Sequence, residues 1–475
     1  MMPDVNWVTK LGAVALVACM LAARPMFAQA PPGYVDASSF GFNPIDATAA
    51  LQAAIDTGSN VYVPNMASDW IVTPITLPHS NQEILFQSGV VIAAKSGSFL
   101  GVEDALFSAV GQSNVKLTGY GATFKMRKSD YQQAPYPSGE WRHGINLRDV
   151  SGVEIRGLTI NDTGGDGVYL GTNTQTGFNS DVVIKDVVLN NNHRQGISVI
   201  SVQNLLVDNA VIMNTNGTDP EAGIDFEVNF QTQRIMNVQI RNSIIQANDS
   251  YGILFAGYSD LQAGPITVDI ENVTILGNKA DGIRLYDPLP GVTIKDSLIV
   301  GNMGAGLRGA QGTFVLPRNS IEYSALKSNG LGSLAGWTQL GTGSFTNVTP
   351  IFYSQDPASP YFLFLQPSNP LSILQGAQDG GYLGARPSYV AGDYDANGKV
   401  DVADYIVWRK NPDGFGGNPA GYNTWRANFG KPSGSGAALG ASSAVPEPCG
   451  MLWAVGGVGV LVLRRSNRRS QLANR

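Results

Sequence analysis

A four-residue pattern recurs through the middle of the chain: a glycine, an apolar residue, a variable residue and a second apolar residue. The first copy, Gly144-Ile145-Asn146-Leu147, is followed by copies at spacings of 23, 29, 27, 29 and 30 residues, which begin at Gly167, Gly196, Gly223, Gly252 and Gly282. A nearly constant period of this size is typical of supersecondary units that stack on one another. The repeat therefore predicts a solenoid over this part of the chain.

Two more apolar runs lie between successive glycines. One alternates apolar and polar residues, as Val153-Glu154-Ile155 and Val238-Gln239-Ile240 do, and a shorter run follows it, such as Val273 to Ile275. Three strand-length runs in each unit, without helical periodicity, predict an all-β fold. The economical solution is a parallel β-helix with three short strands per turn.

The composition agrees with this interpretation and excludes others. Glycine occurs 56 times and charged residues make up only 14% of the chain, which favours a repeat fold. The net charge of −6 argues against a protein that binds nucleic acid through its phosphates. The two cysteines, Cys19 and Cys449, lie in terminal segments, so no disulfide framework and no cysteine zinc site holds this fold together.

Asparagines support the stacked arrangement. One stands four residues before each of several repeat glycines, at Asn192, Asn248, Asn278 and Asn302. At the same corner of successive turns, their amides are expected to hydrogen-bond from turn to turn and to tolerate a left-handed backbone. We interpret these residues as a structural ladder and not as catalytic groups.

The segment Asp46 to Ile55, with Val61-Tyr62-Val63-Pro64 and Gly89-Val90-Val91-Ile92, resembles the opening of the pectate-lyase-like superfamily of right-handed β-helices. The resemblance implies a right-handed, single-stranded solenoid over residues 31–390. It also implies a short helix that caps the open end, with an apolar face of Ala50, Leu51, Ala54 and Ile55. The superfamily includes lyases, hydrolases, epimerases and noncatalytic adhesins, so the resemblance leaves the activity open.

Strand alternation predicts which side chains leave the solenoid. Residues one and three places after each glycine point inward, so those two and four places after it lie on one outer face. The residue before each glycine is expected to face solvent as well. In the first four turns these positions and their neighbours hold Gln195 and the titratable or aromatic residues His143, Arg148, Asp166, Tyr169, Arg194, Asp225 and Glu227.

Two aspartates on this face suggest acid–base chemistry. At about 4.8 Å per turn, the backbones of Asp166 and Asp225 lie roughly 9.6 Å apart, with Arg194 on the turn between them. Inverting glycoside hydrolases use two carboxyls about 6.5–9.5 Å apart, one as general acid and one to activate water. The candidate catalytic residues for hydrolysis are Asp166, Arg194, Asp225 and Glu227.

The same face suits β-elimination or C5 epimerisation of a uronic-acid polymer. In those reactions a base removes a proton and a cation neutralises the adjacent carboxylate. The candidate bases are Tyr169 and His193, and the candidate cations are Arg194, Arg148 and Arg142. The candidate substrate-binding residues are His143, Arg148 and Arg284.

A noncatalytic role is the alternative to both reactions. Asp166 could cap a turn, and Arg194 could form a surface ion pair with Glu221 or Asp225 that adds under about 1 kcal/mol. The protein would then bind a polysaccharide without changing it, or serve as a structural protein of the cell surface.

Oxygen-bearing side chains recur at fixed places between Asp393 and Asp404. They occupy loop positions 1, 3, 5, 9 and 12, with Gly398 at position 6 and the Lys399 carbonyl at position 7, which is an EF-hand-like spacing. The candidate calcium ligands are Asp393, Asp395, Asn397, Lys399, Asp401 and Asp404. With a helix expected from Tyr405 to Lys410, residues 391–432 resemble half of a type I dockerin, which implies structural calcium and a possible cohesin-like partner.

The N-terminal residues predict export. An apolar run from Leu11 to Ala23 follows Lys10, and Ala28-Gln29-Ala30 supplies small residues for cleavage, so residues 1–30 are predicted to be a signal peptide. The alternative is cleavage before Cys19, as in a lipoprotein.

The C-terminal residues predict anchoring. A linker at 433–444 leads into residues 445–475, where Pro446-Glu447-Pro448, an apolar stretch and a basic end resemble a PEP-CTERM sorting tail. The resemblance implies an exosortase-type processing enzyme and a secreted protein of the cell envelope with a transient or permanent membrane anchor. An ordinary C-terminal anchor would give the same location.

Overall fold

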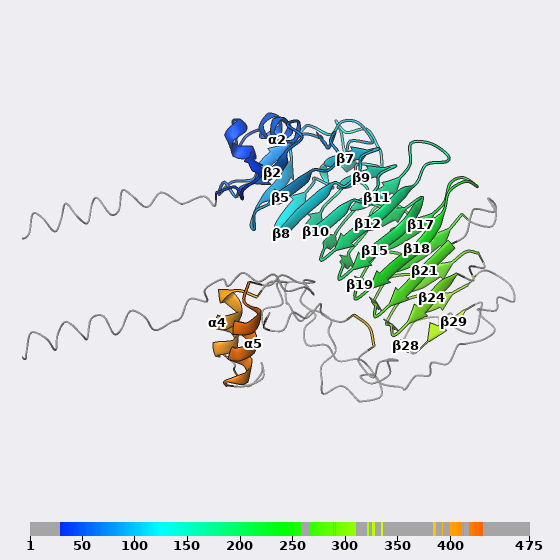
Figure 1. Cartoon of the computed structure of the whole chain (residues 1–475). Coiled ribbons are helices and arrows are strands. Elements are labelled where there is room, and N and C mark those ends of the chain that lie inside the picture. The colour runs from blue at the N-terminus through cyan, green and yellow to red at the C-terminus, as the bar shows by residue number, and fades with distance from the viewer. Residues whose placement is uncertain are drawn as a thin grey trace, which may run out of the picture. The chain divides into compact units, whose positions relative to one another are not determined.

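The computed structural model describes residues 29–257, 266–287, 289, 291–309, 321–322, 325–327, 334–335, 383–385, 392, 400–410, 412 and 418–430. The chain divides into two compact units, Met1–Pro387 and Ser388–Arg475. The first unit is a stack of strands and the second contains two helices (Figure 1).

The first unit is a right-handed parallel β-helix, as the sequence predicts. Its strands, over the described residues, pair in parallel and form a ten-stranded and a 19-stranded sheet. The ten-stranded sheet consists of β4 (Ile75–Thr76), β7 (Phe107–Val110), β9 (Ile145–Arg148), β11 (Val168–Gly171), β14 (Ile197–Val199), β17 (Ile224–Glu227), β20 (Ile253–Ala256), β23 (Ile283–Leu285), β26 (Leu307–Arg308) and β29 (Leu334–Ala335).

The 19-stranded sheet contains two rows of strands. One row is β1 (Tyr34–Asp36), β2 (Asn60–Val63), β5 (Glu83–Phe86), β8 (Lys116–Lys125), β10 (Glu154–Asn161), β12 (Asn179–Lys185), β15 (Val202–Asp208), β18 (Ile235–Arg241), β21 (Ile266–Glu271), β24 (Val292–Lys295) and β27 (Ile321–Glu322). The other row is β3 (Trp70–Val72), β6 (Val91–Ala94), β13 (Val188–Asn190), β16 (Val211–Met213), β19 (Ile244–Gln246), β22 (Thr274–Leu276), β25 (Leu298–Val300) and β28 (Ala325–Lys327). The long strands β8 and β10 belong to both rows, because each pairs with strands of both.

The interior of the solenoid is apolar and continuous. The residues one and three places after each repeat glycine are buried, including Ile145, Val168, Ile197, Ile224 and Ile253, as strand alternation predicts. Stacking places like residues over like, so that Ile197 pairs with Ile224 and the Phe226 and Phe255 rings stack 4.8 Å apart. Each turn therefore covers the apolar side chains of the next.

A short helix covers the N-terminal end of this interior. Helix α2 (Thr48–Ile55) buries Ala50, Leu51, Ala54 and Ile55, the four residues expected on its apolar face. The 3-10 turn η1 (Ala37–Phe40) precedes it, and the side chain of Asp36 caps that turn by accepting from Ser38 N. The helix thus keeps water from the first turn of strands.

The asparagine ladder is present, but one detail of its prediction is wrong. Asn248 Nδ2 donates to Asn278 Oδ1 at 2.9 Å, and Asn278 Nδ2 donates to Asn302 Oδ1 at 2.8 Å, all three side chains being buried. The left-handed backbone falls on the residue before each of them, at Ala247, Gly277 and Gly301. Because the residue before the asparagine makes the turn, the asparagine side chain points into the stack and hydrogen-bonds to main-chain groups.

The second unit contains α4 (Val402–Lys410) and α5 (Ala420–Asn428). Val400, Trp408 and Trp425 form its buried cluster, and Trp425 Nε1 donates to the carbonyl of Asp401. The sequence predicted the first helix only from Tyr405, so its first turn was missed. Aromatic packing over two short helices gives this unit a core of its own.

The targeting signals lie largely outside the described residues. This applies to the signal peptide up to residue 28, the linker and the PEP-CTERM-like tail, which stay predictions. None of the helices that the structure describes is long and apolar enough to cross a membrane.

Adjacent residues of β15 provide a test of the inward assignment. Leu205 is buried and Leu206 is partly exposed on the outer side of the same strand. We expect Leu205→Asp to unfold several turns, because a charge would enter the apolar stack without a partner. Leu206→Asp is the matched control and should change the melting temperature little. Equal melting curves for the two variants, measured by circular dichroism, would contradict the assignment.

Candidate functional site

The candidate site lies on the outer side of the ten-stranded sheet. Across the turns, Asn146 of β9 is in register with Tyr169 of β11, then with Ser198 of β14 and Asp225 of β17. Residues 23 to 29 positions apart in the chain therefore become lateral neighbours, as the repeat predicts.

Most of the residues before the glycines do not face solvent, so that expectation was wrong for them, although Tyr251 is partly exposed. His143, Asp166 and Gln195 are buried, and so is Asp225 on the outer face. The side chains cover one another and are covered by a segment before β9. The site is therefore a buried polar cluster, in which charges cost far more free energy than on a solvated face.

Gln195 joins the two aspartates. Its main-chain N–H donates to Asp166 Oδ1 at 3.1 Å, and its side-chain Nε2 donates to Asp225 Oδ2 at 3.1 Å. Asp166 Oδ2 and Asp225 Oδ1 are buried and accept no hydrogen bond from the described residues. Each acid thus has one carboxyl oxygen that accepts a hydrogen bond and one that accepts none from the described residues.

Both carboxyl groups bind their protons more tightly than usual. Burial raises the pKa of Asp166 to about 7, although the Arg194 guanidinium and the Gln195 N–H oppose the shift. Burial also raises the pKa of Asp225 well above its usual range, and the Glu227 carboxylate adds to the effect. Desolvation outweighs the nearby positive charge because no lysine or arginine of the described residues lies within ion-pair distance of either acid.

His143 is held as a neutral ring. Its Nδ1 accepts from Asp166 N at 3.0 Å and lies 3.2 Å from Asp166 Oδ2. Burial, followed by the charges of Arg148 and Arg194, lowers the pKa of His143 well below its usual range. Since Nδ1 is already an acceptor, a protonated Asp166 carboxyl suits this contact better than a carboxylate.

Arg194 lies between two glutamates. Its guanidinium is 3.4 Å from Glu227 and 3.8 Å from Glu140, and its side chain is mostly buried. The ion pair expected with Glu221 or Asp225 is not formed, because Glu221 instead accepts from Gly217 N. The positive charge is already compensated by two carboxylates.

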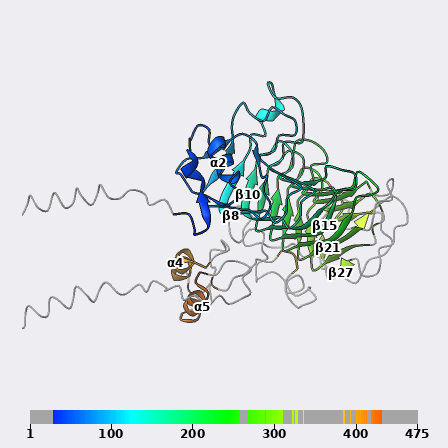
Figure 2. The ribbon, with the colours of Figure 1, turned by 45° about the horizontal axis from the view of Figure 1, so that its top comes forward.

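The segment 126–142, called the covering segment here, closes one side of the cluster. It contains η2 (Asp130–Gln132), which stands out from the turns (Figure 2). Arg142 anchors it: the side chain is fully buried, donates to Phe99 O and Pro137 O, and lies over the rings of Tyr131 and Tyr136. Arg142 is thus structural and not a cation of the site.

Two glycines let the covering segment approach. A Cβ at Gly164 would lie 2.4 Å from the Tyr131 ring, and one at Gly165 would lie 2.7 Å from Glu140 O. A side chain at Gly164 would displace the Tyr131 ring, and one at Gly165 would displace Glu140, which pairs with Arg194.

Tyr169 and Arg148 form a stack with His143. The rings of Tyr169 and His143 are parallel with centroids 4.5 Å apart, and the Arg148 guanidinium lies 5.3 Å from the Tyr169 ring centroid. Burial raises the pKa of Tyr169, so the phenolate that a base requires is scarce at neutral pH. Arg148 also reaches Glu103 at 3.4 Å, so its charge is paired.

His193 lies in a different place from the cluster. It lines a polar pocket of about 660 Å³ beside the covering segment, with Lys128, Gln132 and Asn216 among the other walls. Its Nε2 is 2.9 Å from Thr218 Oγ, and burial lowers its pKa to about 4. His193 and Arg194 therefore point apart, and the structure does not place His193 with the acids.

Arg284 belongs to a second polar group farther along the same face. It is 3.9 Å from Asp281, which also pairs with Arg308 at 2.7 Å and accepts from Ala305 N. Asp281 precedes its repeat glycine as Asp166 does, and each accepts the N–H one turn later. The two aspartates differ in that Asp281 is neutralised by arginines and Asp166 is not.

Sequence reasoning missed several residues of the site. The bridging role of Gln195 depends on side-chain contacts between turns, and the contact of Glu140 with Arg194 depends on the path of the covering segment, which no repeat specifies. The pair Gly164-Gly165 was the available signal, since two glycines in one corner indicate close approach of another chain segment.

The predicted calcium loop is described only at its end. Asp393, Asp395, Asn397 and Lys399 lie outside the described residues, whereas Asp401 and Asp404 lie within them. Asp404 Oδ2 accepts from Asp401 N at 2.7 Å, so this buried carboxylate turns back toward the loop. The described residues contain no group of three or more His, Cys, Asp or Glu side chains placed to hold a metal.

The chain belongs to the right-handed β-helix family. The family described as "right handed beta helix region" matches residues 80–227 and 143–321, which together span just over half of the chain. No curated protein sequence matches it.

Several solved structures resemble it in fold. The family 28 exopolygalacturonase of Yersinia enterocolitica is 15% identical, with 66% of this chain and 67% of that chain covered and a TM-score of 0.42. The catalytic unit of a GH87 α-1,3-glucanase from Streptomyces thermodiastaticus is 14% identical, with 68% and 70% covered and a TM-score of 0.43. The A-module of a mannuronan C-5 epimerase from Azotobacter vinelandii is 16% identical, with 66% and 97% covered and a TM-score of 0.33. At these identities the likeness extends to the fold alone.

Asp166 and Asp281 form a matched pair for a stability test. The folded state binds the Asp166 proton more tightly than the unfolded chain does, so stability falls as pH rises from about 4 to about 7. We expect Asp166→Asn to stabilise the protein at about pH 8 by up to a few kcal/mol, at about 1.4 kcal/mol per pKa unit, and not at about pH 4. Asp281→Asn should destabilise it at about pH 8, because it removes an ion pair. Denaturation in urea measures both, and equal losses at about pH 8 would contradict the special state of Asp166.

Proposed function

We propose that the protein acts on an extracellular polysaccharide and hydrolyses its glycosidic bonds. The supporting observation is the pair Asp166 and Asp225, two buried acids on alternate turns that share Gln195 and lack a cationic partner among the described residues. Their backbones are two strand spacings apart, about 9.6 Å, near the upper end of the carboxyl separation in inverting glycosidases.

The environments of the two acids assign their roles. Asp225 has Glu227 nearby and accepts only from a side-chain amide, so it retains its proton and serves as the general acid. Asp166 accepts a main-chain N–H and is closer to half ionised near neutral pH, so it serves as the general base. The solvent-accessible Glu227 is the second candidate for the base.

The same burial favours a second candidate function, noncatalytic carbohydrate binding. Both carboxyl groups are buried, so neighbouring side chains have to shift before a sugar reaches either of them. Elimination or epimerisation has less support, because Arg194 and Arg148 are paired with glutamates and the raised pKa of Tyr169 keeps its phenolate scarce at neutral pH.

Activity of three variants tests the proposal on a panel of neutral and acidic polysaccharides. Asp166→Asn and Asp225→Asn should each lower kcat by about 10² or more, the scale of a lost acid or base. The kcat/KM of the wild type should rise with pH to about 7, as Asp166 loses its proton, and fall again as Asp225 ionises. If Glu227→Gln loses activity and Asp166→Asn retains it, the general base is Glu227 and not Asp166. Full activity in all three would show that the site lies elsewhere, and no turnover at all would favour the binding protein.

We also propose that residues 393–404 bind structural calcium. The placement of Asp404, at the start of α4 and turned toward the loop, supports a carboxylate ligand at the last loop position. Calorimetry on the whole chain should show one calcium-binding event that Asp393→Ala abolishes. Binding by the Asp393→Ala variant with unchanged affinity would contradict the proposal. A cohesin-like partner stays a prediction.

The ends of the chain are proposed to direct it to the cell envelope. A signal peptide at 1–30 and a PEP-CTERM-like tail at 445–475 suit a polysaccharide outside the cell. Mass spectrometry of protein from cell fractions distinguishes cleavage after Ala30 from lipidation at Cys19.

A further inference from the structure

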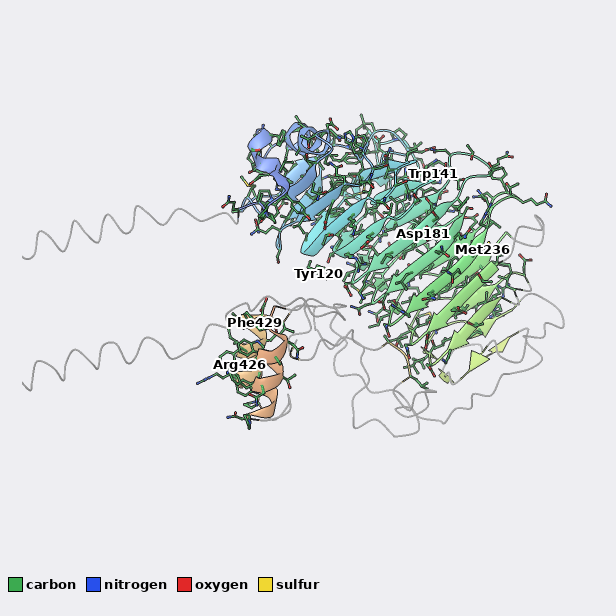
Figure 3. All side chains as sticks on the ribbon, viewed as in Figure 1. Tyr120, Trp141, Asp181, Met236, Arg426 and Phe429 are labelled. Atoms are coloured by element: carbon green, nitrogen blue, oxygen red, sulfur yellow. The ribbon has the colours of Figure 1, made fainter. Side chains whose placement is uncertain are left out.

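An exposed tryptophan lies beside the acid cluster. Trp141 is 42% exposed, although both of its neighbours in the chain are fixed: Glu140 contacts Arg194, and Arg142 is fully buried. Figure 3 shows Trp141 at an edge of the stacked strands. Its backbone is therefore anchored, and the large apolar surface of its ring is available to a ligand.

A second exposed aromatic ring lies on the other side of the acids. Tyr286, just after β23, is 46% exposed. The Arg284 guanidinium lies 4.5 Å from its ring centroid, and its hydroxyl is 3.2 Å from the hydroxyl of Tyr251. These contacts fix the ring in place without covering it.

The two rings flank the acids along the axis of the solenoid. Trp141 precedes β9 and Tyr286 follows β23, and these two strands are five spacings apart in the order of the ten-stranded sheet. At about 4.8 Å per spacing, the two strands lie about 24 Å apart along the axis. Asp166 and Asp225, in the turns of β11 and β17, lie between them. A ligand that contacts both rings is longer than a single sugar and extends past the acids on both sides.

The charges along this face are balanced. Four arginines of this face are each near a carboxylate: Arg148 with Glu103, Arg194 with Glu140 and Glu227, and Arg284 and Arg308 with Asp281. Each of these cations is already paired with a carboxylate, so it would attract a polymer with a carboxylate on every sugar only weakly. The glutamates of the face would repel such a polymer. An uncharged polymer would not be repelled by the glutamates and needs no unpaired cation to bind.

We propose that this face binds a neutral polysaccharide along the solenoid axis, with Trp141 and Tyr286 as stacking platforms on either side of Asp166 and Asp225. The proposal rests on the proposed function and adds the substrate class and the attack on interior bonds. The apolar faces of sugar rings pack on the aromatic rings, while paired arginines and glutamates offer hydrogen bonds to hydroxyl groups.

Binding is measured in the Asp166→Asn/Asp225→Asn background, which prevents turnover. Affinity electrophoresis uses laminarin, mixed-linkage glucan and xylan as neutral polymers, and polygalacturonate and alginate as polyuronates. We expect binding to at least one neutral polymer, weakened on the order of tenfold by Trp141→Ala or by Tyr286→Ala. Trp141→Phe and Tyr286→Phe should retain most of the affinity. Phe40→Ala, which removes an exposed ring from η1, is the matched control and should have no effect.

The outcomes separate the two proposals. Unchanged affinity in both alanine variants, or tighter binding of a polyuronate than of every neutral polymer, would overturn this inference and leave a polysaccharide-active protein. Binding of no polymer, with no turnover by the wild type, would overturn both. Where the wild type does cleave a polymer, an early fall in viscosity indicates interior attack, and release of single end sugars contradicts it.

Discussion

Main-chain hydrogen bonds between successive turns are the constraint on which the structure depends. Gly167 N donates to Gln195 O and Gly196 N donates to Ala222 O, and the same contact recurs along the ten-stranded sheet. These bonds hold the turns at one spacing, so equivalent positions of the repeat line up in columns. The columns create the apolar interior and also place the two aspartates beside one glutamine.

The repeat uses the same position for opposite purposes. Asp166 and Asp281 both precede a glycine and both accept a main-chain N–H from the following turn. Two arginines compensate Asp281, whereas Asp166 faces a neutral histidine and keeps a raised pKa. A buried carboxyl without a cation lowers stability, and such a cost is typical of a residue retained for chemistry.

One corner of the solenoid combines several of these roles in consecutive residues. Asn191 takes the left-handed backbone, Asn192 is the buried ladder residue, His193 lines the polar pocket, Arg194 lies between two glutamates and Gln195 joins the two acids. Because the chain turns sharply here, adjacent side chains point to different sides of the molecule. In this fold, a residue that is adjacent in sequence to a functional residue therefore need not belong to the same site.

The β-helix, its inward residues, the capping helix and the columns that contain Asp166, Tyr169 and Asp225 could be predicted from the amino acids alone, because a fixed period and strand alternation are local rules that repeat from turn to turn. The burial of the acids, the pairing of Arg194 with Glu140 and Glu227, and the direction of His193 became known from the folded chain. The contact of Arg194 with Glu140 depends on the covering segment, which crosses the turns outside the repeat. Its packing on Gly164 and Gly165 removes water from one side of the cluster, and that desolvation changes the charge states of the acids.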